Sequence, residues 1–495
     1  MDKSIQYFTD FCIRRFMELQ EAFFNNPSDI ASYVYGLDEE LRKLGVAMIK
    51  ESIELIDETL CKNGRRKDNW QIEKHVRKQL ITSLGNVDFS KTLFTHKETG
   101  EMKYLVDSLM DIEPHQRITE DAMARIYEEV AQTSYRKAGK SVSYLDDVSK
   151  QTVKRMLHQT QFPKQYKKPA KKREVPYLYI DADEDHVSLQ FQEKKGDLKR
   201  NEYGRKNNCI ITKLIYVYEG IEPEKPGSKR NRLIKPFYFS RVCDGKENEK
   251  LWDEVYEYMD TMYDLSKVKK IYLNADGGGW IQTGKRRIQG IVTAVDEFHM
   301  QKYITKMVAH TKDSRDDAKA EIYAAIRKGT KEDFAGVVDR LIAVAEESEH
   351  KKIIEGANYI LNNWSGAKTR LIKRAELFGC SAEGHVSHVL SARMSSRPLG
   401  WSKTGAAAMA QLRAYYWNKG NMLELARYQK EEVPMAAGAE RLTLSAAEIY
   451  SDIRAGRSIY EMQLGKYVEA ITHTYSIQSR NKAQWSAHKW IGGGF

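Results

Sequence analysis

Two aspartates at two-residue spacing, Asp181 and Asp183, stand in the segment IDADED within a stretch that is typical of a β-strand. Because side chains alternate between the two faces of a strand, both carboxylates point to the same face. Neighbouring carboxylates repel each other unless a cation relieves them, and oxygen ligands of this kind suit Mg²⁺. An EF-hand is excluded, because its sixth position would be His186 and its twelfth Gln192. The alternative is a solvated strand end.

A third aspartate, Asp276, closes the apolar run KKIYLNAD and is followed by the glycines of GGGWI. Sites in α/β proteins form at the carboxyl ends of such buried strands, and glycines let a backbone or a phosphate come close. The glycines do not match a dinucleotide-binding fingerprint, because the sixth position counted from Gly277 is Gln282. The alternative for this segment is an ordinary turn after a strand.

A glutamate, Glu383, opens the predicted helix SAEGHVSHVLSARM. On a helical wheel it shares a face with Val386, Leu390, Met394 and Arg397, so we expect it to face the protein. A carboxylate in that position needs a metal or a basic partner. The alternative is a first-turn acid that interacts favourably with the helix dipole.

Together these acids lie on three separate elements: a first strand, a later strand and a late helix. Two-metal phosphoryl chemistry needs acids that converge from different elements on two cations about 4 Å apart. We therefore expect two Mg²⁺ ions, which Mn²⁺ could replace. A zinc site of Cys380, His385 and His388 is disfavoured, because no fourth ligand stands at a suitable spacing.

The elements that must position these acids form a mixed sheet. Strands are predicted at 176–192, 210–218 and 234–242, followed by a helix at 246–263, a strand ending at 276, a short helix, and a strand from 290. An all-helical insertion follows. Before the core, we predict a helical region at 1–70, then at 71–160 a β-hairpin (87–107) plus a helix-turn-helix-like DNA-binding region, and a basic linker at 161–175. The catalytic core is predicted in two parts, 176–299 and its final helix at 376–400, with the helical insertion at 300–375 between them. A helical region with a basic tail is predicted at 401–495.

Two segments before the core could contact nucleic acid. In SVSYLDDVSKQTVKRMLHQ a short helix, a turn near Asp146–Ser149 and a second helix capped by Ser149 have the rhythm of a helix-turn-helix. Its exposed polar residues would be Gln151, Thr152, Lys154 and Arg155. The linker adds Lys167, Lys168, Lys171, Lys172 and Arg173. The alternatives are an ordinary surface helix and a solvated spacer.

Composition narrows the classes of protein. The chain has 495 residues, with 80 Lys and Arg against 69 Asp and Glu, and this formal charge of +11 favours a polyanionic partner such as nucleic acid. The five cysteines form no CxxC pair, which argues against a disulfide framework and indicates a reducing cytosol. The first residues do not read as a signal peptide, and no run of about 18 apolar residues predicts a membrane span.

Several segments taken in order resemble one family. YIDADEDHVSLQ, YLNADGGGWI, VDEFHMQKYI and GCSAEGHVSHVLSARMSSRPLGWS make the chain similar to DDE transposases of bacterial insertion sequences, most closely the ISLre-two type, which is related to Mutator-like transposases. The resemblance covers nearly the whole chain. It implies an RNase H-like core, interrupted by a helical insertion, and a nucleoid-associated protein in the bacterial cytoplasm.

The resemblance also implies roles for residues. It assigns the catalytic triad to Asp183, Asp276 and Glu383, with Asp181 as the alternative to Asp183 for the first acid, and it makes Asp296 and His299 a supporting pair. Asp181 is also expected to be a metal ligand. The implied reaction is metal-dependent cleavage of DNA at the element ends, followed by strand transfer to target DNA by at least a dimer.

Three further residues beside these acids are DNA-binding candidates. Trp280 could stack on a base, and Arg393 and Arg397 could hold phosphates. The alternatives are a core aromatic for Trp280 and ion pairs with acids for the arginines.

Two other functions remain open. A D-x-D glycosyltransferase would use Asp181 and Asp183 but gives Glu383 no role. A non-catalytic DNA-binding regulator would need only residues 117–175, and DNA binding by the isolated fragment 1–175 would favour it.

Overall fold

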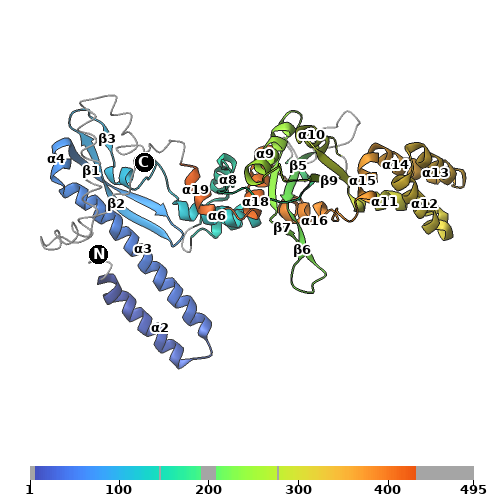
Figure 1. Ribbon diagram of the computed structural model, residues 1–495. Coiled ribbons are helices and arrows are strands. Elements are labelled where there is room, and N and C mark those ends of the chain that lie inside the picture. Colours follow the sequence, from blue (N-terminus) through green and yellow to red (C-terminus); the bar gives the residue numbers. More distant parts are fainter. Residues whose placement is uncertain (1–5, 144–146, 191–207, 276–277, 398, 431–495) are drawn as a thin grey trace. The chain divides into compact units, whose positions relative to one another are not determined.

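The computed structural model describes residues 6–143, 147–190, 208–275, 278–397 and 399–430 (Figure 1). The chain forms two compact units. One consists of Met1–Arg155 together with Met422–Phe495, and the other of Met156–Asn421. The predicted basic tail lies outside the described residues.

The first unit combines helices with a small antiparallel sheet in the order β1-β2-β3. Its elements are a π-helical turn η1 (Phe8–Cys12), α2 (Ile13–Asn25), α3 (Ile30–Lys62), α4 (Gly64–Asn69), β1 (Trp70–Ile81), β2 (Asn86–His96), β3 (Met102–Lys103), α5 (Leu105–Leu109), α6 (Glu120–Gln132), α7 (Tyr135–Lys140), the start of α8 (Lys150–Gln159) and α19 (Met422–Tyr428). The long helix α3 packs on β2, and α19 packs on α6. The predicted helical character of the first 70 residues is therefore confirmed for the described residues up to Asn69.

The predicted β-hairpin is confirmed at its turn, where β2 pairs with β3 at Phe94–Lys103 and Thr95–Met102, but its second arm is short. Strand β2 pairs along its whole length with β1, which precedes the predicted segment, whereas the expected second arm contributes only the two residues of β3 before α5 begins. The sequence of β1, WQIEKHVRKQLI, is rich in charge because most of its side chains are exposed, so it lacks the apolar alternation of a half-buried strand.

The helix-turn-helix prediction is partly wrong. Residues 141–143 and 147 are not helical, and residues 144–146 of the predicted helix and turn lie outside the described residues; the nearest described helix before α8 is α7. The two helices approach closely at Gly139, where an added Cβ would lie 2.0 Å from the carbonyl oxygen of Val148. The predicted cap is confirmed, because the Ser149 hydroxyl accepts a hydrogen bond from the backbone N–H of Thr152 at 3.1 Å.

The second unit is built on a five-stranded mixed sheet in the order β10-β9-β4-β5-β8. Its strands are β4 (Tyr177–Ser188), β5 (Cys209–Tyr218), β8 (Phe237–Arg241), β9 (Lys270–Ala275) and β10 (Ile291–Val295), with a separate ribbon of β6 (Gly220–Pro223) and β7 (Asn231–Ile234). Strand β4 is antiparallel to β5 and parallel to β9. The predicted succession of strands is confirmed, but the ribbon was not predicted.

Helices cover both faces of this sheet. On one face α9 (Glu247–Met262) and α10 (Gly279–Arg287) pack over Leu178, Ile180 and Ala182 of β4 in an apolar core that also contains Trp252. On the other face lie α16 (Ala382–Val386), a π-helical turn η3 (Ser387–Ser391), α17 (Ala392–Met394) and α18 (Lys403–Trp417). This second face carries the odd-numbered residues of β4, including all three of its aspartates.

The predicted all-helical insertion is confirmed. It consists of α11 (Glu297–Met307), the 3₁₀ turn η2 (Ala309–Ser314), α12 (Arg315–Lys328), α13 (Lys331–Ala343), α14 (Glu347–Asn362) and α15 (Trp364–Ile372). These helices bury their own apolar cluster, which includes Ile326, Phe334 and Ile360. They enter from the end of β10 and return to the sheet just before α16.

The basic segment 161–175 lies along the second unit. Tyr166 packs against the core of the sheet, Lys164 pairs with Glu257 at 2.5 Å, and Lys172 lies 3.5 Å from Asp260 on the same helix, α9. It is therefore a packed strap and not a solvated spacer. Among the residues that the structure describes, no helix is long and apolar enough to cross a membrane.

Candidate active site

Asp181, Asp183 and Asp185 occupy alternate positions on β4 and share the face covered by α16 and the helical turns after it. Their burial differs. Asp181 has no exposed surface, while Asp183 and Asp185 are partly buried. The strand thus carries one interior carboxylate and two near its solvent-accessible end.

The Asp181 carboxylate is surrounded by donors. Its Oδ1 accepts from the Tyr218 hydroxyl at 3.1 Å and the Asn274 amide at 2.7 Å. Its Oδ2 accepts from the Tyr216 hydroxyl at 2.8 Å and the backbone N–H of Ser381 at 3.2 Å. Burial raises the pKa of Asp181, and these hydrogen bonds oppose that rise because they stabilise the charged form.

This geometry gives Asp181 a role other than the metal ligand that we expected. A carboxylate offers about four lone-pair sites, and four N–H and O–H donors already use them, while the Cys380 thiol is a fifth donor 3.7 Å from Oδ2. Asp181 instead joins β4 to β5, to β9 and to the residue just before α16. It is a structural anchor beneath the surface that bears Asp183.

A buried arginine, Arg370 on α15, extends this network. Its Nη2 donates to Oδ1 of Asn274 at 2.6 Å, its Nε to the Val295 carbonyl at 2.9 Å, and its Nη1 to the Phe378 carbonyl at 2.7 Å. The guanidinium is 2% exposed. It therefore connects β9, β10 and the segment that leads into α16, and its positive charge lies one amide group away from Asp181.

The helical segment after Ser381 is attached to β4 at both ends. At its start Ser381 binds Asp181, and at its end the Ser395 hydroxyl donates to both oxygens of Asp185, at 3.0 and 2.8 Å. Asp183 lies between these two attachment points. Its Oδ1 accepts from the backbone N–H of Glu184 at 2.8 Å.

Glu383 lies in the first turn of α16, but its side chain is exposed, contrary to our expectation that it would face the protein. Val386, Leu390 and Met394 are buried as predicted. Because Glu383 and Val386 both belong to α16, the π-helical turn η3 after them does not cause this exposure; it adds one residue to a turn and rotates the residues beyond it by about 100°. The face predicted from a regular helix therefore does not run straight from Glu383 to Met394.

Asp276 lies outside the described residues. The parallel register of β4 and β9 pairs Asp181 with Asn274 and Ala182 with Ala275. In the sequence, Asp183 follows Ala182 and Asp276 follows Ala275. Among the residues that are described, no three His, Cys, Asp or Glu side chains are arranged to hold a metal ion.

The predicted supporting pair is in contact. Asp296 is 7% exposed and caps α11, where Oδ1 accepts from the backbone N–H of Phe298 at 3.2 Å. Its Oδ2 lies 2.6 Å from Nδ1 of His299. Because Asp296 directly follows β10, the pair lies at the same carboxyl edge of the sheet toward which β9 runs.

The remaining predicted residues are spread over the molecule. Trp280 is half-buried beside Trp252 and donates to Glu184 at 2.6 Å, on the face of β4 opposite to Asp183. Arg393 is 8% exposed, and its guanidinium lies 5.0 Å from the centre of the Trp401 ring, which leaves little of it for a phosphate. Arg397 is exposed.

The predicted DNA-contacting side chains of α8 and the strap are mostly on the surface. Gln151, Lys154 and Arg155 are exposed, and Thr152 is half-buried. In the strap, Lys172 and Arg173 have acidic partners, since Arg173 lies 3.1 Å from Glu219. The other predicted strap lysines are exposed: Lys167, Lys168 and Lys171, of which Lys171 lies 3.4 Å from Glu174.

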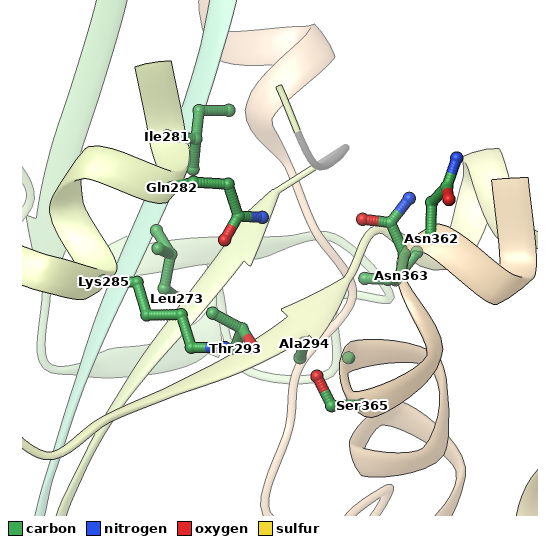
Figure 2. Close-up of a pocket in the computed structure, with 11 residues that line it drawn as sticks. Leu273, Ile281, Gln282, Lys285, Thr293, Ala294, Asn362, Asn363 and Ser365 are labelled. Carbon is green, nitrogen blue, oxygen red and sulfur yellow. The ribbon is translucent and has the colours of Figure 1, made fainter. Parts of the chain in front are cut away.

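A small polar cavity of about 80 Å³ lies between α10, β10 and the start of α15 (Figure 2). Figure 2 shows Gln282 and Lys285 on one side and Asn363 and Ser365 on the other. This volume suits a few water molecules and excludes a nucleotide. We therefore place no substrate there.

Comparison with known proteins identifies one protein family. The sequence pattern of the uncharacterised protein family UPF0236 matches residues 25–432. A UPF0236 protein of Caldanaerobacter subterraneus subsp. tengcongensis is 35% identical over 431 residues, which cover 87% of this chain and 86% of the relative. A second from that strain is 36% identical over 420 residues, covering 85% and 84%. The name of the first joins eleven gene designations, and that of the second joins four.

A solved structure of the Drosophila P element transposase strand transfer complex covers 72% of this chain and 93% of its own. The identity is 11% and the TM-score 0.21. A TM-score this low gives no information about the activity of this chain.

Proposed function

The chain belongs to the UPF0236 family, whose name assigns no activity, and from the site itself we propose that the protein is a divalent-metal-dependent DNA transposase of the DDE type. In this proposal Asp183, Asp276 and Glu383 bind the metal ions. The reaction is cleavage of DNA strands at the ends of an insertion sequence and transfer of those ends to target DNA.

One observation carries the proposal. Asp181 and Asp185 attach the two ends of the helical segment that bears Glu383 to the strand that bears Asp183. The neighbouring strand β9 runs parallel to β4 and ends one residue before Asp276. In this proposal the three carboxylates, which belong to three different elements, converge beside the middle of β4 around Asp183, as a two-metal site requires.

The sheet order supports an RNase H-like core. The central strand β4 has the antiparallel neighbours β5 and β8 on one side and the parallel neighbours β9 and β10 on the other. The strands follow the chain in the succession that the resemblance implies, and the helical insertion stands between the last strand and the helix with Glu383.

The chemistry of the donor set fits hard cations. All three side chains offer only oxygen ligands, which Mg²⁺ and Mn²⁺ prefer. Bound there, two such ions would activate a water or 3′-hydroxyl and stabilise the leaving oxygen. The chain itself holds the acids apart: Asp183 by the strand, Glu383 by the helix anchored on Asp181.

DNA as the partner is supported by charge. The chain carries a formal +11, and exposed basic residues occur on α8 and on the strap, as with Lys154, Arg155 and Lys168. The name of one relative joins eleven gene designations of one strain, and several gene copies in one genome are expected of a mobile element. Bringing two DNA ends together further calls for at least a dimer in the cytoplasm.

The test is cleavage of labelled DNA carrying the sequences that flank this gene, with Mg²⁺ or Ca²⁺. We expect nicking with Mg²⁺ that Asp276→Asn and Glu383→Gln each abolish. The matched control is Glu347→Gln, an equally exposed first-turn glutamate on α14 of the insertion, which should leave cleavage unchanged.

Specific DNA binding with no cleavage in any metal would contradict the proposal and favour a non-catalytic regulator. Hydrolysis of a nucleotide sugar without DNA would favour the D-x-D glycosyltransferase instead.

A further inference from the structure

A large basic cavity lies in the first unit, on a different part of the chain from the acidic site. It has a volume of about 710 Å³ and is bordered by residues 76–79 of β1, by β3, by α5 and by the segment 112–117. This volume is in the range of sites that bind organic ligands. None of the DNA-binding residues predicted from the sequence lines it.

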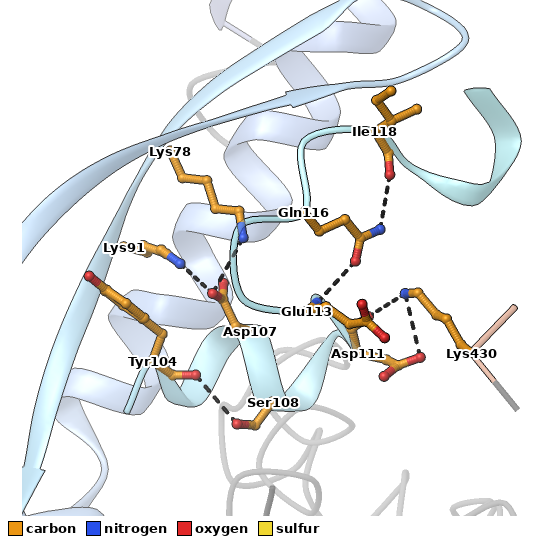
Figure 3. A network of polar contacts seen from close by, with 10 residues as sticks. All are labelled: Lys78, Lys91, Tyr104, Asp107, Ser108, Asp111, Glu113, Gln116, Ile118 and Lys430. Atoms are coloured by element: carbon orange, nitrogen blue, oxygen red, sulfur yellow. Dashed lines mark hydrogen bonds and ion pairs between the residues drawn. The ribbon is translucent and has the colours of Figure 1, made fainter. Parts of the chain in front are cut away.

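The cavity lining has an excess of positive charge. Five Lys or Arg residues face two acids, a formal excess of three. Lys78 and Lys91 come from adjacent strands and both approach Oδ2 of Asp107, Lys78 at 3.5 Å (Figure 3). One carboxylate thus serves two ammonium groups, so one of their charges has no counterion inside this cluster.

The inner ammonium group is fixed in place. Lys91 is 5% exposed, and its Nζ lies 3.6 Å from the centre of the Tyr104 ring in addition to its contact with Asp107. Burial lowers the pKa of Lys91 and of Lys103, because both ammonium groups are taken partly out of water. A bound anion would remove that penalty.

The rim of the cavity is where an anion can approach. Oδ1 of Asp107 is buried and has no hydrogen-bond partner among the described residues, so the floor next to it repels an anion. Lys103 is half-buried and Arg117 is exposed. The backbone of Arg117 is held against β1, since its carbonyl accepts from the N–H of Ile81 at 2.8 Å. Both side chains are therefore carried by anchored backbone.

We propose that this cavity binds phosphate groups of a DNA backbone, with Lys103 and Arg117 as the direct contacts and the Lys78–Lys91–Asp107 cluster as a fixed positive field behind them. The inference rests on the proposed function for the identity of the polyanion. Contacts of this type position DNA without reading its sequence. The site would hold the duplex while the acidic site of the other unit reacts.

The experiment measures binding without cleavage. The full chain is titrated with a fluorescein-labelled duplex of arbitrary sequence in EDTA, over a series of salt concentrations. For the double variant Lys103→Gln/Arg117→Gln we expect at least about tenfold weaker binding at low salt. The slope of log K against log salt should become shallower by about two, since each phosphate contact on duplex DNA contributes about 0.9.

Two further variants make the result specific. Arg14→Gln/Lys50→Gln removes the same charge from exposed helical positions that do not line the cavity, and it should retain both affinity and slope. Lys78→Gln leaves Lys91 to pair with Asp107, and it should weaken binding less than the rim variant does.

The other results of these binding experiments would each overturn a specific part of the proposal. Wild-type affinity and slope in the rim variant, with cleavage intact, would overturn the cavity proposal alone. Absence of DNA binding by the wild type would overturn the proposed function as well. Calorimetric binding of inorganic phosphate that the rim variant abolishes, with DNA affinity unchanged, would assign the cavity to free phosphate and overturn the DNA proposal.

Discussion

Oδ2 of Asp181 accepts a hydrogen bond from the backbone N–H of Ser381 at 3.2 Å, so the residue two before Asp183 holds the residue two before Glu383. The strand and the helix that carry two proposed metal ligands are thus fixed to each other directly beneath them. The same carboxylate binds Asn274, two residues before Asp276. In the proposed site this buried acid positions the segments that carry the three proposed metal ligands.

This relationship predicts that two similar substitutions change the free energy of unfolding by different amounts. Asp181→Asn places an amide NH₂ against groups that already donate, the N–H of Ser381 or the amide of Asn274, so we expect a loss of about 1–3 kcal/mol of unfolding free energy. Asp183→Asn should change stability by less than about 1 kcal/mol, because its side chain is only partly buried. Urea denaturation followed by circular dichroism measures both.

Both variants should lose cleavage, so activity alone does not separate the roles. The separating measurement is stabilisation by added Mn²⁺, which Asp183→Asn should abolish. If the Asp181→Asn protein were as stable as the wild type but were not stabilised by Mn²⁺, Asp181 would be the metal ligand and not the structural anchor.

Arg370 should be among the residues that the second unit tolerates least. Arg370→Met leaves three acceptors without their donor, the carbonyls of Val295 and Phe378 and the side chain of Asn274. We expect about 3–5 kcal/mol of destabilisation in the same urea titration. Arg374→Met, an exposed arginine four residues on, should cost under about 0.5 kcal/mol, and an equal cost at both positions would contradict the network.

Two glycines of α10 provide a matched pair. A Cβ at Gly284 would lie 2.5 Å from the buried indole of Trp252, whereas a Cβ at Gly279 meets nothing within 4 Å. Gly284→Ala should therefore destabilise by about 1–3 kcal/mol through overpacking. Gly279→Ala should be neutral or stabilising by up to about 1 kcal/mol, because alanine favours the helix. Thermal denaturation of the two variants tests the packing of α10 against α9, and equal melting temperatures would contradict it.

The sequence predicted best where local pattern and burial coincide. The apolar runs of β5 and β9 and the succession of helices in the insertion could be read from short windows, because a buried strand and an amphipathic helix leave a periodic signal. Strand β1 was not predicted, because its exposed, charged side chains carry no such periodic signal. Its pairing with β2 decides its conformation.

In the candidate acidic site, too, some features could be predicted from the sequence and others depend on the fold. The three acids stand out in the sequence because Asp183 alternates with Asp181 on a strand, Asp276 follows an apolar run and Glu383 opens a helix. The anchoring role of Asp181 could not be read, because its donors come from residues 216, 218, 274 and 381, which only the fold brings together. The single local hint is the alternation of Tyr216 and Tyr218 on β5, which puts two hydroxyls on one face.

His385 gives the second unit a predictable dependence on pH. Its ring centre lies 4.7 Å from that of Tyr216, its Nδ1 lies 3.0 Å from the Tyr238 hydroxyl, and burial lowers its pKa to about 4. In the unfolded chain a histidine titrates near pH 6.5. Between these values the unfolded state binds the extra proton, so the free energy of unfolding must fall as pH decreases from about 6.5 to about 4. Below about 4 this contribution is constant.

We expect the wild type to lose on the order of 2 kcal/mol more than His385→Phe across this window, since part of the ring remains in contact with water. Phenylalanine keeps the stacking on Tyr216 but has no proton to gain. Urea titrations at a series of pH values measure the difference, and taking wild type minus variant cancels the carboxylates that titrate in the same range. Ser387→Ala, an exposed neighbour without a titrating group, should reproduce the wild-type slope. Equal slopes for the wild type and His385→Phe would mean that the imidazole is protonated as readily in the folded protein as in water, and that Tyr238 does not hold it neutral.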